Sequence, residues 1–366
     1  GARQISSSKS GCLPPAADDD PAVGLAGRRG LNARALAKEA RAAAIADLAG
    51  LCSRPLVSLR SGRAPSRWTR DMTRVAVIGA GLSGLTLARR LAAHADVTVF
   101  EKSRGYGGRL ATRRTDEFAF DHGAQFFTAR SAAFRDFLAP LVAAGVVDTW
   151  HARFAELGGD GPPVARQWVR EVPHYVGRPG MSAIGRHLGA GLDVRLRTRV
   201  GAIDRRDDAW VVLDDGGETL GHCDWVLATA PAEQTAALMP RDFDGHARLA
   251  QTRMLGCFAL MLGFDGPVEL PFDAALVRDS TLSWISVNHS KPGRSDSSTL
   301  VALASNAWSE DHLDTRLDAV LGDMREELDR VLGRSLPAAR MADVHRWRYA
   351  NIPTQPGERS LLDARN

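Results

Sequence analysis

The chain has 366 residues, which is enough for two domains of ordinary size. Its 44% hydrophobic and 25% charged residues are typical of a soluble globular protein, and no apolar run is long enough to span a bilayer. Four cysteines without CxxC spacing argue against a zinc site or a disulfide framework, so we expect no bound metal and a reducing, cytoplasmic location.

The formal net charge of +4 is unevenly distributed. Residues 1–71 hold 12 of the 47 Lys and Arg residues and 6 of the 43 Asp and Glu residues, which leaves 35 basic and 37 acidic residues in 72–366. The basic character therefore belongs to this leader, and the charge predicts neither a nucleic-acid partner nor a membrane partner.

The leader is unlike the rest of the chain. Residues 1–31 and 53–71 mix Arg, Ser, Pro and Gly without periodicity, whereas the Ala-rich residues 32–50 favour a helix. The Arg and Ser content is compatible with an organelle transit peptide, but the acidic run Asp18-Asp19-Asp20 argues against one. We expect a disordered or non-native leader and a natural protein that begins at Met72.

The globular pattern opens with a dinucleotide-binding turn. Arg74–Ile78 (RVAVI) is a short apolar run, as a buried parallel strand requires, and a GxGxxG sequence follows it. Gly79 permits the tight turn, Gly81 lets a pyrophosphate approach the main chain, and Gly84 lets a helix lie close to the strand.

The sequence next predicts a helix from Leu82 to about His94, whose first turn, with Ser83, directs free N–H groups at the pyrophosphate. A second strand, Asp96–Phe100, ends at Glu101, 17 residues after the last glycine of the turn. A carboxylate there accepts hydrogen bonds from a ribose hydroxyl.

A Gly-Gly-Arg sequence distinguishes FAD from NAD. Lys102 follows the ribose-binding acid, and Gly107, Gly108 and Arg109 come within eight residues of it. Two glycines let a second main-chain segment press against the pyrophosphate, which Arg109 can neutralise. Flavoproteins of the glutathione-reductase-like and amine-oxidase-like group use such a clamp; the alternative is a surface loop with a solvated arginine.

The next segment carries a family resemblance. Residues 120–130 read FDHGAQFFTAR and, after GGRLATRR, resemble the renalase family, particularly its bacterial members. Further similar segments are PHYVGRPGMSAIGRHL (173–188), LSWISVNHSKPGR (282–294) and HRWRYANIP (345–353). The resemblance covers residues 72–366.

The resemblance implies an α/β fold: a two-domain FAD-binding Rossmann-type flavoprotein like p-hydroxybenzoate hydroxylase and monoamine oxidase, with a β-sheet substrate domain. It implies noncovalent FAD and oxidation of isomeric dihydronicotinamide dinucleotides to NAD(P)+, with dioxygen reduced to hydrogen peroxide, as metabolite repair. An amine oxidase or desaturase of the same fold is the alternative within enzymes. A non-catalytic nucleotide-binding protein is the alternative from another class. The oligomeric state is not readable.

The expected domains are discontinuous. The FAD-binding domain takes 72–114, 191–232 and 339–366, and the substrate domain takes 115–190 and 233–338.

The expected elements after the clamp are strands at Leu192–Leu196 and Val200–Asp204, a hairpin of Ala209–Asp214 and Glu218–Leu220, a buried strand at Asp224–Ala230, and a helix at Asp311–Val331. The helix would pack through Leu313, Leu317, Val320, Leu321, Met324 and Leu328.

Hydride transfer to a flavin needs orientation rather than a nucleophile, so we expect a stacking platform and hydrogen-bond donors. Ala124, Gln125 and Phe126 are the candidates beside the flavin ring, with Gln125 bonding flavin or a substrate carboxamide. The resemblance implies that the segment Arg199-Val200 meets the adenine through its main chain. Phe126 or Phe127 could wall the pocket. The further substrate-face candidates are Trp284, Asn288, Trp308, Trp347 and Tyr349. We expect packing or main-chain roles for Asp121, His122, His289 and His345 rather than base catalysis.

The family pattern continues past the segment that matches GERSLLDA with a strand, a Gly-Asp pair that bonds the ribityl chain, and a helix directed at the flavin. The sequence ends at Asn366 before these features. From this difference we expect the chain as written to bind FAD weakly or not at all.

Overall fold

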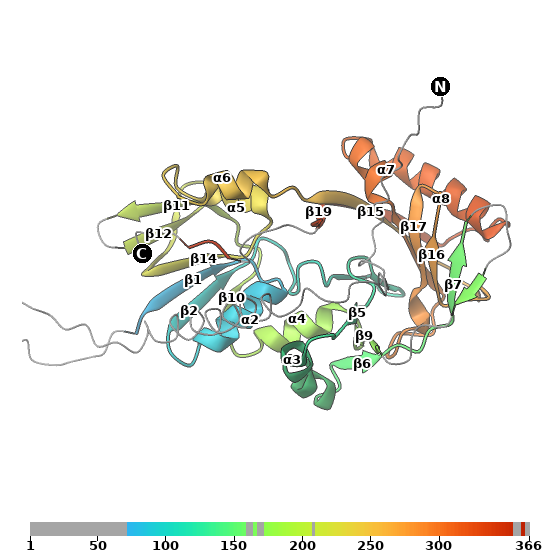
Figure 1. Ribbon diagram of the computed structural model, residues 1–366, viewed down its shortest axis with the longest axis horizontal. Coiled ribbons are helices and arrows are strands. Elements are labelled where there is room, and N and C mark those ends of the chain that lie inside the picture. Colours follow the sequence, from blue (N-terminus) through green and yellow to red (C-terminus); the bar gives the residue numbers. More distant parts are fainter. Residues whose placement is uncertain (1–71, 159–163, 167–171, 207–208, 354–359, 363–366) are drawn as a thin grey trace, which may run out of the picture.

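The computed structural model describes residues 72–158, 164–166, 172–206, 209–353 and 360–362. The expected leader, residues 1–71, lies outside the described residues. Figure 1 shows two groups of strands at the two ends of an elongated molecule, with helices below and above them.

A four-stranded parallel sheet forms the first group, in the order β10-β2-β1-β14. Its strands are β1 (Arg74–Ile78), β2 (Asp96–Phe100), β10 (Asp193–Arg195) and β14 (Trp225–Ala228). Four of the five residues of β1 are buried, as expected for a strand that is covered on both faces. Helix α2 (Leu82–Leu91) follows β1, starts where predicted and ends about one turn earlier.

Both faces of this sheet are covered. On one face α2 packs with α3 (Ala132–Ala143) and α4 (Ser182–Gly189), whose Leu138 and Ile184 share one buried cluster with Val77 of β1. A small sheet, β5-β9-β6, adjoins these helices. Its strands are β5 (Phe127–Thr128), β9 (His174–Gly177) and β6 (Val147–Thr149). The expected division of 115–190 from the FAD-binding domain stays a prediction, and this packing shows how closely the segment adjoins the parallel sheet.

The other face carries an antiparallel meander, β11-β12-β13. Its strands are β11 (Val200–Arg206), β12 (Ala209–Asp214) and β13 (Thr219–Cys223), and they lie beside α5 (Ala232–Leu238) and α6 (His246–Gln251) (Figure 1). Ile78 and Val212 meet in its buried cluster. The predicted hairpin is confirmed, with β12 at the expected bounds, because its turn is encoded locally by Asp215-Gly216-Gly217.

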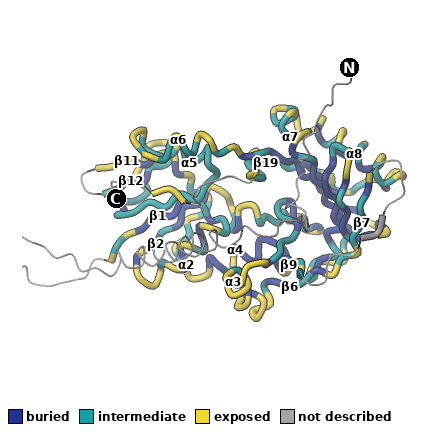
Figure 2. Tube along the Cα trace, in the orientation of Figure 1, coloured by how far each residue is buried: buried dark blue, intermediate teal, exposed yellow. Residues whose placement is uncertain are grey.

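A seven-stranded sheet forms the second group, in the order β19-β15-β18-β17-β16-β7-β8 (Figure 1). Its strands are β7 (Phe154–Leu157), β8 (Val164–Arg166), β15 (Leu255–Gly263), β16 (Ala274–Val277), β17 (Leu282–Val287), β18 (Thr299–Ala304) and β19 (Met341–Asn351). Figure 2 shows that its central strands are buried almost throughout. Such apolar strands need cover on both faces.

Alternation along β15 assigns the two faces of this sheet. Phe258 and Leu260 point to the face covered by α8 (Leu317–Leu332) and α7 (Asn306–Asp311). Ala259 and Met261 point to the opposite face, which meets Phe120 of the hairpin β3-β4. That hairpin consists of β3 (Thr112–Arg114) and β4 (Ala119–Asp121), and a 3-10 turn, η1 (Asn288–Ser290), follows β17.

The predicted helix at Asp311–Val331 corresponds to α8, with two corrections. It begins at Leu317, so Leu313 lies in the turn between α7 and α8. Leu317 is 42% exposed, whereas Val320, Met324 and Leu328 are fully buried against the sheet. Asp318 in the first turn favours this start, because an acidic side chain complements the positive end of the helix dipole.

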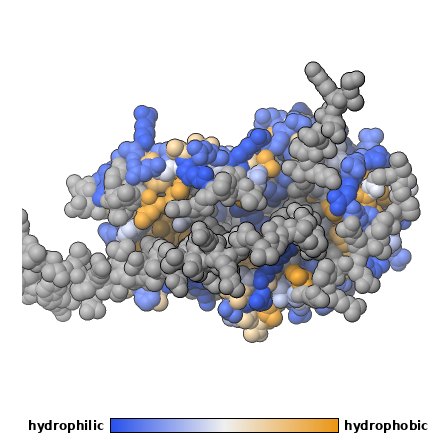
Figure 3. Space-filling model, in the orientation of Figure 1, coloured by the Kyte–Doolittle hydropathy of each residue, from blue (hydrophilic) through white to orange (hydrophobic). Residues whose placement is uncertain are grey.

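The coloured surface in Figure 3 is mostly hydrophilic, with hydrophobic residues gathered in small areas. Among the described residues, the helices are too short or too polar to cross a membrane.

Candidate functional site

The GxGxxG turn is tightly packed at its first and last glycines. Gly79 has φ +106°, and its N–H donates to the carbonyl of Phe100 at 2.8 Å. A Cβ on Gly84 would lie 2.0 Å from the carbonyl oxygen of Gly79, so only glycine fits. Thr229, directly after β14, donates its hydroxyl to the carbonyl of Ile78 at 2.9 Å and fixes the end of β1.

The middle glycine has open space beside it. A Cβ on Gly81 would have no heavy atom within 4 Å among the described residues, its chain neighbours aside. Gly81 precedes α2 as its N-cap, and no side chain caps the helix. The free N–H groups at the start of α2 therefore face the position where a phosphate binds in such turns.

The Gly-Gly-Arg segment lies directly on this turn. The N–H of Gly107 donates to the carbonyl of Ala80 at 2.8 Å, and Gly107 forms a parallel bridge with Gly81. Gly108 has φ +55°, and a Cβ there would lie 3.2 Å from the Cα of Gly81. The two main-chain segments thus form one surface, and the segment is not a free loop.

Glu101 is held at the end of β2 beside this surface. Its buried carboxylate accepts hydrogen bonds from the N–H of Ala80 at 2.7 Å and from the N–H of Ser103 at 2.8 Å. The main chain before β11 runs alongside, because the N–H of Thr198 donates to the carbonyl of Glu101 at 2.8 Å. Buried Val200 follows two residues later, so the residue expected to meet the adenine lies close in sequence to the main chain that bonds Glu101.

Two cationic side chains flank the turn. Burial lowers the pKa of Arg109, and its guanidinium donates to the carbonyl of Ala350 at 2.9 Å. Burial is the main cause that lowers the pKa of Lys102, and repulsion from Arg199 contributes. The Lys102 ammonium group donates to the amide oxygen of Gln234 at 3.0 Å. Arg109 is thus drawn toward the end of β19, next to the nucleotide turn.

These residues fit FAD. The space beside Gly81 and the N–H groups of Leu82 and Ser83 suit the pyrophosphate, and the Glu101 carboxylate suits the ribose. The loop 122–125 continues this surface toward the second sheet. The N–H of Ala124 donates to the carbonyl of Arg109 at 2.9 Å, and a Cβ on Gly123 would lie 2.1 Å from the same oxygen.

A buried ionic cluster lies behind this loop. It consists of Asp121, Gln125, Asn288, Lys291 and Arg294, which we call the Asp121 cluster. Arg294 contacts the Asp121 carboxylate at 2.5 Å, and Lys291 lies 3.6 Å from it. The N–H of Met181 and the hydroxyl of Thr112 also donate to this carboxylate, at 2.9 and 2.7 Å.

The cluster shifts the pKa values of its members. Burial alone would raise the pKa of Asp121, but Lys291 and Arg294 outweigh burial, so the pKa lies below its ordinary value. Burial lowers the pKa of Lys291 to about 8, and Arg294 adds to this effect while Asp121 opposes it. Asp121 is therefore a carboxylate at neutral pH, paired inside the protein and fixed to the main chain, as predicted, rather than available as a base.

The Gln125 side chain belongs to this cluster, and its expected bond to flavin or a substrate carboxamide stays a prediction. Its amide nitrogen donates to the carbonyls of Asp121 and Gly123, at 2.6 and 3.0 Å. Its amide oxygen accepts from Lys291 at 3.0 Å. Both ends of the amide are thus used within the protein, which leaves the main chain of the loop for contact with a ligand.

A second group, His122, His345 and Trp347, lies on the other side of the loop; we call it the His-Trp cluster. The indole N–H of Trp347 donates to the main-chain carbonyl of His122 at 2.8 Å. The Trp347 and His122 rings also stack, with 5.4 Å between their centroids. The rings of His345 and His122 meet edge to face at 4.7 Å. Burial is the main cause that lowers the pKa of His122 to about 4, and the nearby His345 contributes. Burial is also the main cause that lowers the pKa of His345, and the nearby Arg113 contributes. Both imidazoles are therefore neutral at pH 7.

The remaining candidates divide between the two faces of the large sheet. Phe126 contacts His174 and buried Trp284, at centroid distances of 4.9 and 5.4 Å, on the face of the His-Trp cluster. Tyr349 follows Trp347 on β19, where the register against β15 shifts, so alternation does not assign it to a face. Trp308 packs with Phe258 on the opposite face, so the structure does not bring it to the other candidates.

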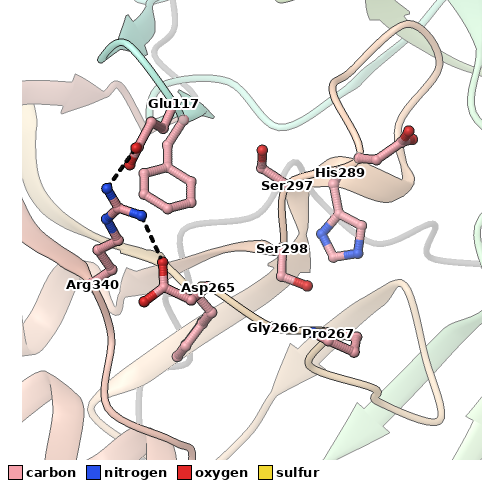
Figure 4. Close-up of a pocket in the computed structure, with 11 residues that line it drawn as sticks. Glu117, Asp265, Gly266, Pro267, His289, Ser297, Ser298 and Arg340 are labelled. Carbon is pink, nitrogen blue, oxygen red and sulfur yellow. Dashed lines mark hydrogen bonds and ion pairs between the residues drawn. The ribbon is translucent and has the colours of Figure 1, made fainter.

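A surface cavity of about 460 Å³ lies at the turn of the β3-β4 hairpin, away from the nucleotide turn (Figure 4). Arg340 bonds both Glu117 and Asp265 in it, at 2.6 and 3.0 Å, and His289 lines the side near Ser298. Since Asp121 marks the opposite end of this hairpin, the cavity is separate from the candidate site.

Lys291 and Arg294 were not predicted to have a role, although they lie in the segment LSWISVNHSKPGR. A signal was available, because two cations follow a strand whose residues are all apolar or small and uncharged. Their partner, Asp121, is 170 residues before Lys291 and 173 before Arg294, and only the fold brings them together.

Comparison with known families identifies both parts of the chain. Residues 77–141 match the NAD(P)-binding Rossmann-like domain, and residues 156–365, more than half of the chain, match the family described as flavin containing amine oxidoreductase. The 4,4'-diapophytoene desaturase of Staphylococcus haemolyticus (strain JCSC1435) is 50% identical over 50 residues, which are 13% of this chain and 10% of the desaturase. This match therefore spans about a tenth of the curated relative.

Solved structures share the fold at low identity. A putative protoporphyrinogen oxidase from Exiguobacterium sp. 255-15 has a TM-score of 0.61 at 16% identity, over 77% of this chain and 88% of that chain. A wild-type putrescine oxidase bound to putrescine has a TM-score of 0.55 at 13% identity, over 74% and 84%. An oxidoreductase from Methanosarcina mazei has a TM-score of 0.57 at 14% identity, over 76% and 90%.

The predicted fold class, a Rossmann-type α/β flavoprotein related to the amine oxidases, is confirmed, and the predicted cofactor, FAD, is that of the matched family. The narrower resemblance to renalases stays a prediction. The nucleotide turn, its Gly-Gly-Arg clamp and the match over residues 156–365 together place this chain in the family of flavin-containing amine oxidoreductases.

Proposed function

We propose that this protein is an FAD-dependent oxidase that removes hydride from a carbon bonded to a nitrogen with a free lone pair. The observation that carries the proposal is the His-Trp cluster, which is an uncharged aromatic surface beside the loop 122–125. FAD, when bound, supplies the hydride acceptor and returns the electrons to dioxygen as hydrogen peroxide.

The chain's own residues would orient and desolvate the substrate. The imidazoles of His122 and His345 stay neutral because burial disfavours their charged forms. The nearby charges of Arg113 and Asp343 pair with each other at 2.5 Å. Such a surface favours an uncharged ring or the neutral form of an amine over an ammonium ion, and only the neutral amine has a lone pair that can assist hydride loss.

The first substrate class is an amine, in agreement with the family to which the chain belongs. The putrescine oxidase of similar fold is bound to an amine. A polyene, as in the desaturases, has narrower support, since that match covers 13% of this chain.

The second substrate class is an isomeric dihydronicotinamide dinucleotide, in which the reacting carbon also adjoins a nitrogen. The segments that resemble renalases converge in the fold, and this observation favours the class. FDHGAQ supplies Asp121 and His122, NHSKPGR supplies Lys291 and Arg294, and HRWRYA supplies Trp347.

The test is anaerobic mixing of FAD-loaded protein with amines, with isomeric dihydronicotinamides and with a 2-hydroxy acid, followed by visible absorption. We expect the flavin band to bleach with one of the first two classes and not with the third. Trp347→Leu should weaken substrate binding about 2- to 10-fold, because an aromatic pair contributes roughly 0.5–1.5 kcal/mol. The exposed Arg316→Met serves as the control. Absence of bleaching with both nitrogen-containing classes would contradict the proposal.

A further inference from the structure

The Lys291 ammonium group donates to two amide side chains, Asn288 and Gln125, and Gln125 itself belongs to the loop 122–125. Lys291 donates to the amide oxygen of Gln125 at 3.0 Å, and the Gln125 nitrogen donates to the carbonyls of Asp121 and Gly123 at 2.6 and 3.0 Å. These two carbonyls lie on either side of His122. Lys291 thus polarises an amide that holds the main chain at both ends of a three-residue segment.

The same segment is held from its other side. The N–H of Ala124 donates to the carbonyl of Arg109, and Gly123 lies against that oxygen so closely that no side chain fits. The carbonyl of His122 accepts from the indole of Trp347 at 2.8 Å. The loop is therefore fixed between the Asp121 cluster, the nucleotide clamp and the His-Trp cluster.

Charge pairing alone does not account for Lys291. The Asp121 carboxylate is already matched by Arg294 at 2.5 Å, whereas Lys291 lies farther away, at 3.6 Å. One carboxylate and two cations leave a surplus positive charge, and both the Lys291 and Asp121 side chains are fully buried. Burying a surplus cation is unfavourable, which agrees with the lowered pKa of Lys291. A role in orientation explains the residue better than a role in stability.

We propose that Lys291 is a positioning residue, whose ammonium group acts through the Gln125 amide to fix the main chain of residues 121–123 against the flavin ring. The contact between the loop and flavin rests on the proposed function, because only the proposed function makes this loop a wall of the pocket for the flavin ring. The part of the proposal that concerns the loop rests on the hydrogen bonds alone.

The test compares Lys291→Met, Gln125→Leu, the double variant and Arg316→Met as the exposed control. Lys291→Met leaves Asp121 paired with Arg294, so we expect it to fold with at least wild-type thermal stability. Hydrogen exchange of the Ala124 N–H in the cofactor-free protein should accelerate at least about tenfold, because a charge-assisted hydrogen bond is lost. The visible circular dichroism of bound flavin should change as well. The control should alter neither.

A double-variant comparison separates positioning from general loosening. If Lys291 acts through Gln125, the double variant should accelerate exchange no more than the larger single effect. Additive effects, or exchange in Lys291→Met within about twofold of wild type, would overturn the proposal. If Lys291→Met does not fold, wild-type exchange in Gln125→Leu would overturn it. Accelerated exchange without turnover of any nitrogen-containing substrate would leave this inference standing and refute the proposed function alone.

Discussion

Gly81→Val is expected to remove FAD binding while the protein stays folded. Within the described part of the chain, a Cβ at this position would meet no heavy atom beyond its chain neighbours within 4 Å, and the main chain is extended, with φ −75° and ψ 178°, so valine fits the cofactor-free structure. The side chain would instead occupy the space beside the N-terminus of α2, where the pyrophosphate approaches the main chain. We expect FAD affinity to fall at least about 100-fold, which corresponds to about 2.7 kcal/mol.

The matched variant is Gly84→Ala, three residues later in the same turn. Its Cβ would lie 2.0 Å from the Gly79 carbonyl oxygen, so it should destabilise the protein by roughly 1–3 kcal/mol or more through overpacking. Gly81→Val should change the free energy of unfolding by no more than about 1 kcal/mol, the scale of an N-cap substitution. Equilibrium FAD binding and urea unfolding measure the two effects. If Gly81→Val bound FAD as wild type does, the nucleotide site would lie elsewhere.

Asp121→Asn is expected to be the most destabilising conservative change in the site. It removes the one carboxylate between Lys291 and Arg294, so two buried cations lose their shared partner. Breaking a buried ion pair from one side costs about 3–5 kcal/mol. Urea unfolding at pH 7 measures the loss, and Asp318→Asn, in an exposed pair with Arg316, should shift the midpoint far less.

The pH dependence of this difference has a defined sign. The folded-state pKa of Asp121 lies below its ordinary value, so its contribution is present above that ordinary value of about 3.8 and is lost as the pH falls through the lower folded-state pKa. The stability difference between wild type and Asp121→Asn should therefore shrink as the pH falls below about 3.8. A difference that does not shrink there would show that the pKa of Asp121 is not lowered in the folded protein.

Sequence reasoning succeeded where the determinants are local. The glycine spacing, the carboxylate at the end of β2 and the Gly-Gly-Arg segment predicted which main-chain segments meet, and the structure joins them at Gly81 and Gly107. The β12-β13 hairpin was predicted because its turn residues are adjacent in the chain. The start of α8 was placed too early, because the apolar spacing continues through the turn that contains Leu313.

Long-range pairing limited the prediction of the site. The contact between Gln125 and Lys291 was not predicted, because 166 residues separate them in sequence. Trp308 was grouped with Trp347 because their segments resemble the substrate face of the renalase family, but the two side chains pack on opposite faces of the large sheet. The sequence supplied the residue types, and the strand order and register of the large sheet decided which of them meet.

The most direct test of the account is the visible absorption spectrum of the protein expressed from its complete gene, recorded after incubation with FAD and removal of free cofactor. The account predicts flavin bands at about one FAD per chain in the wild-type protein and in Arg316→Met, since the fold provides a single turn-and-clamp site for the dinucleotide among its described residues. It predicts a colourless Gly81→Val protein. A wild-type protein that is folded and colourless at saturating FAD would contradict the assignment of this turn and clamp as a flavin site.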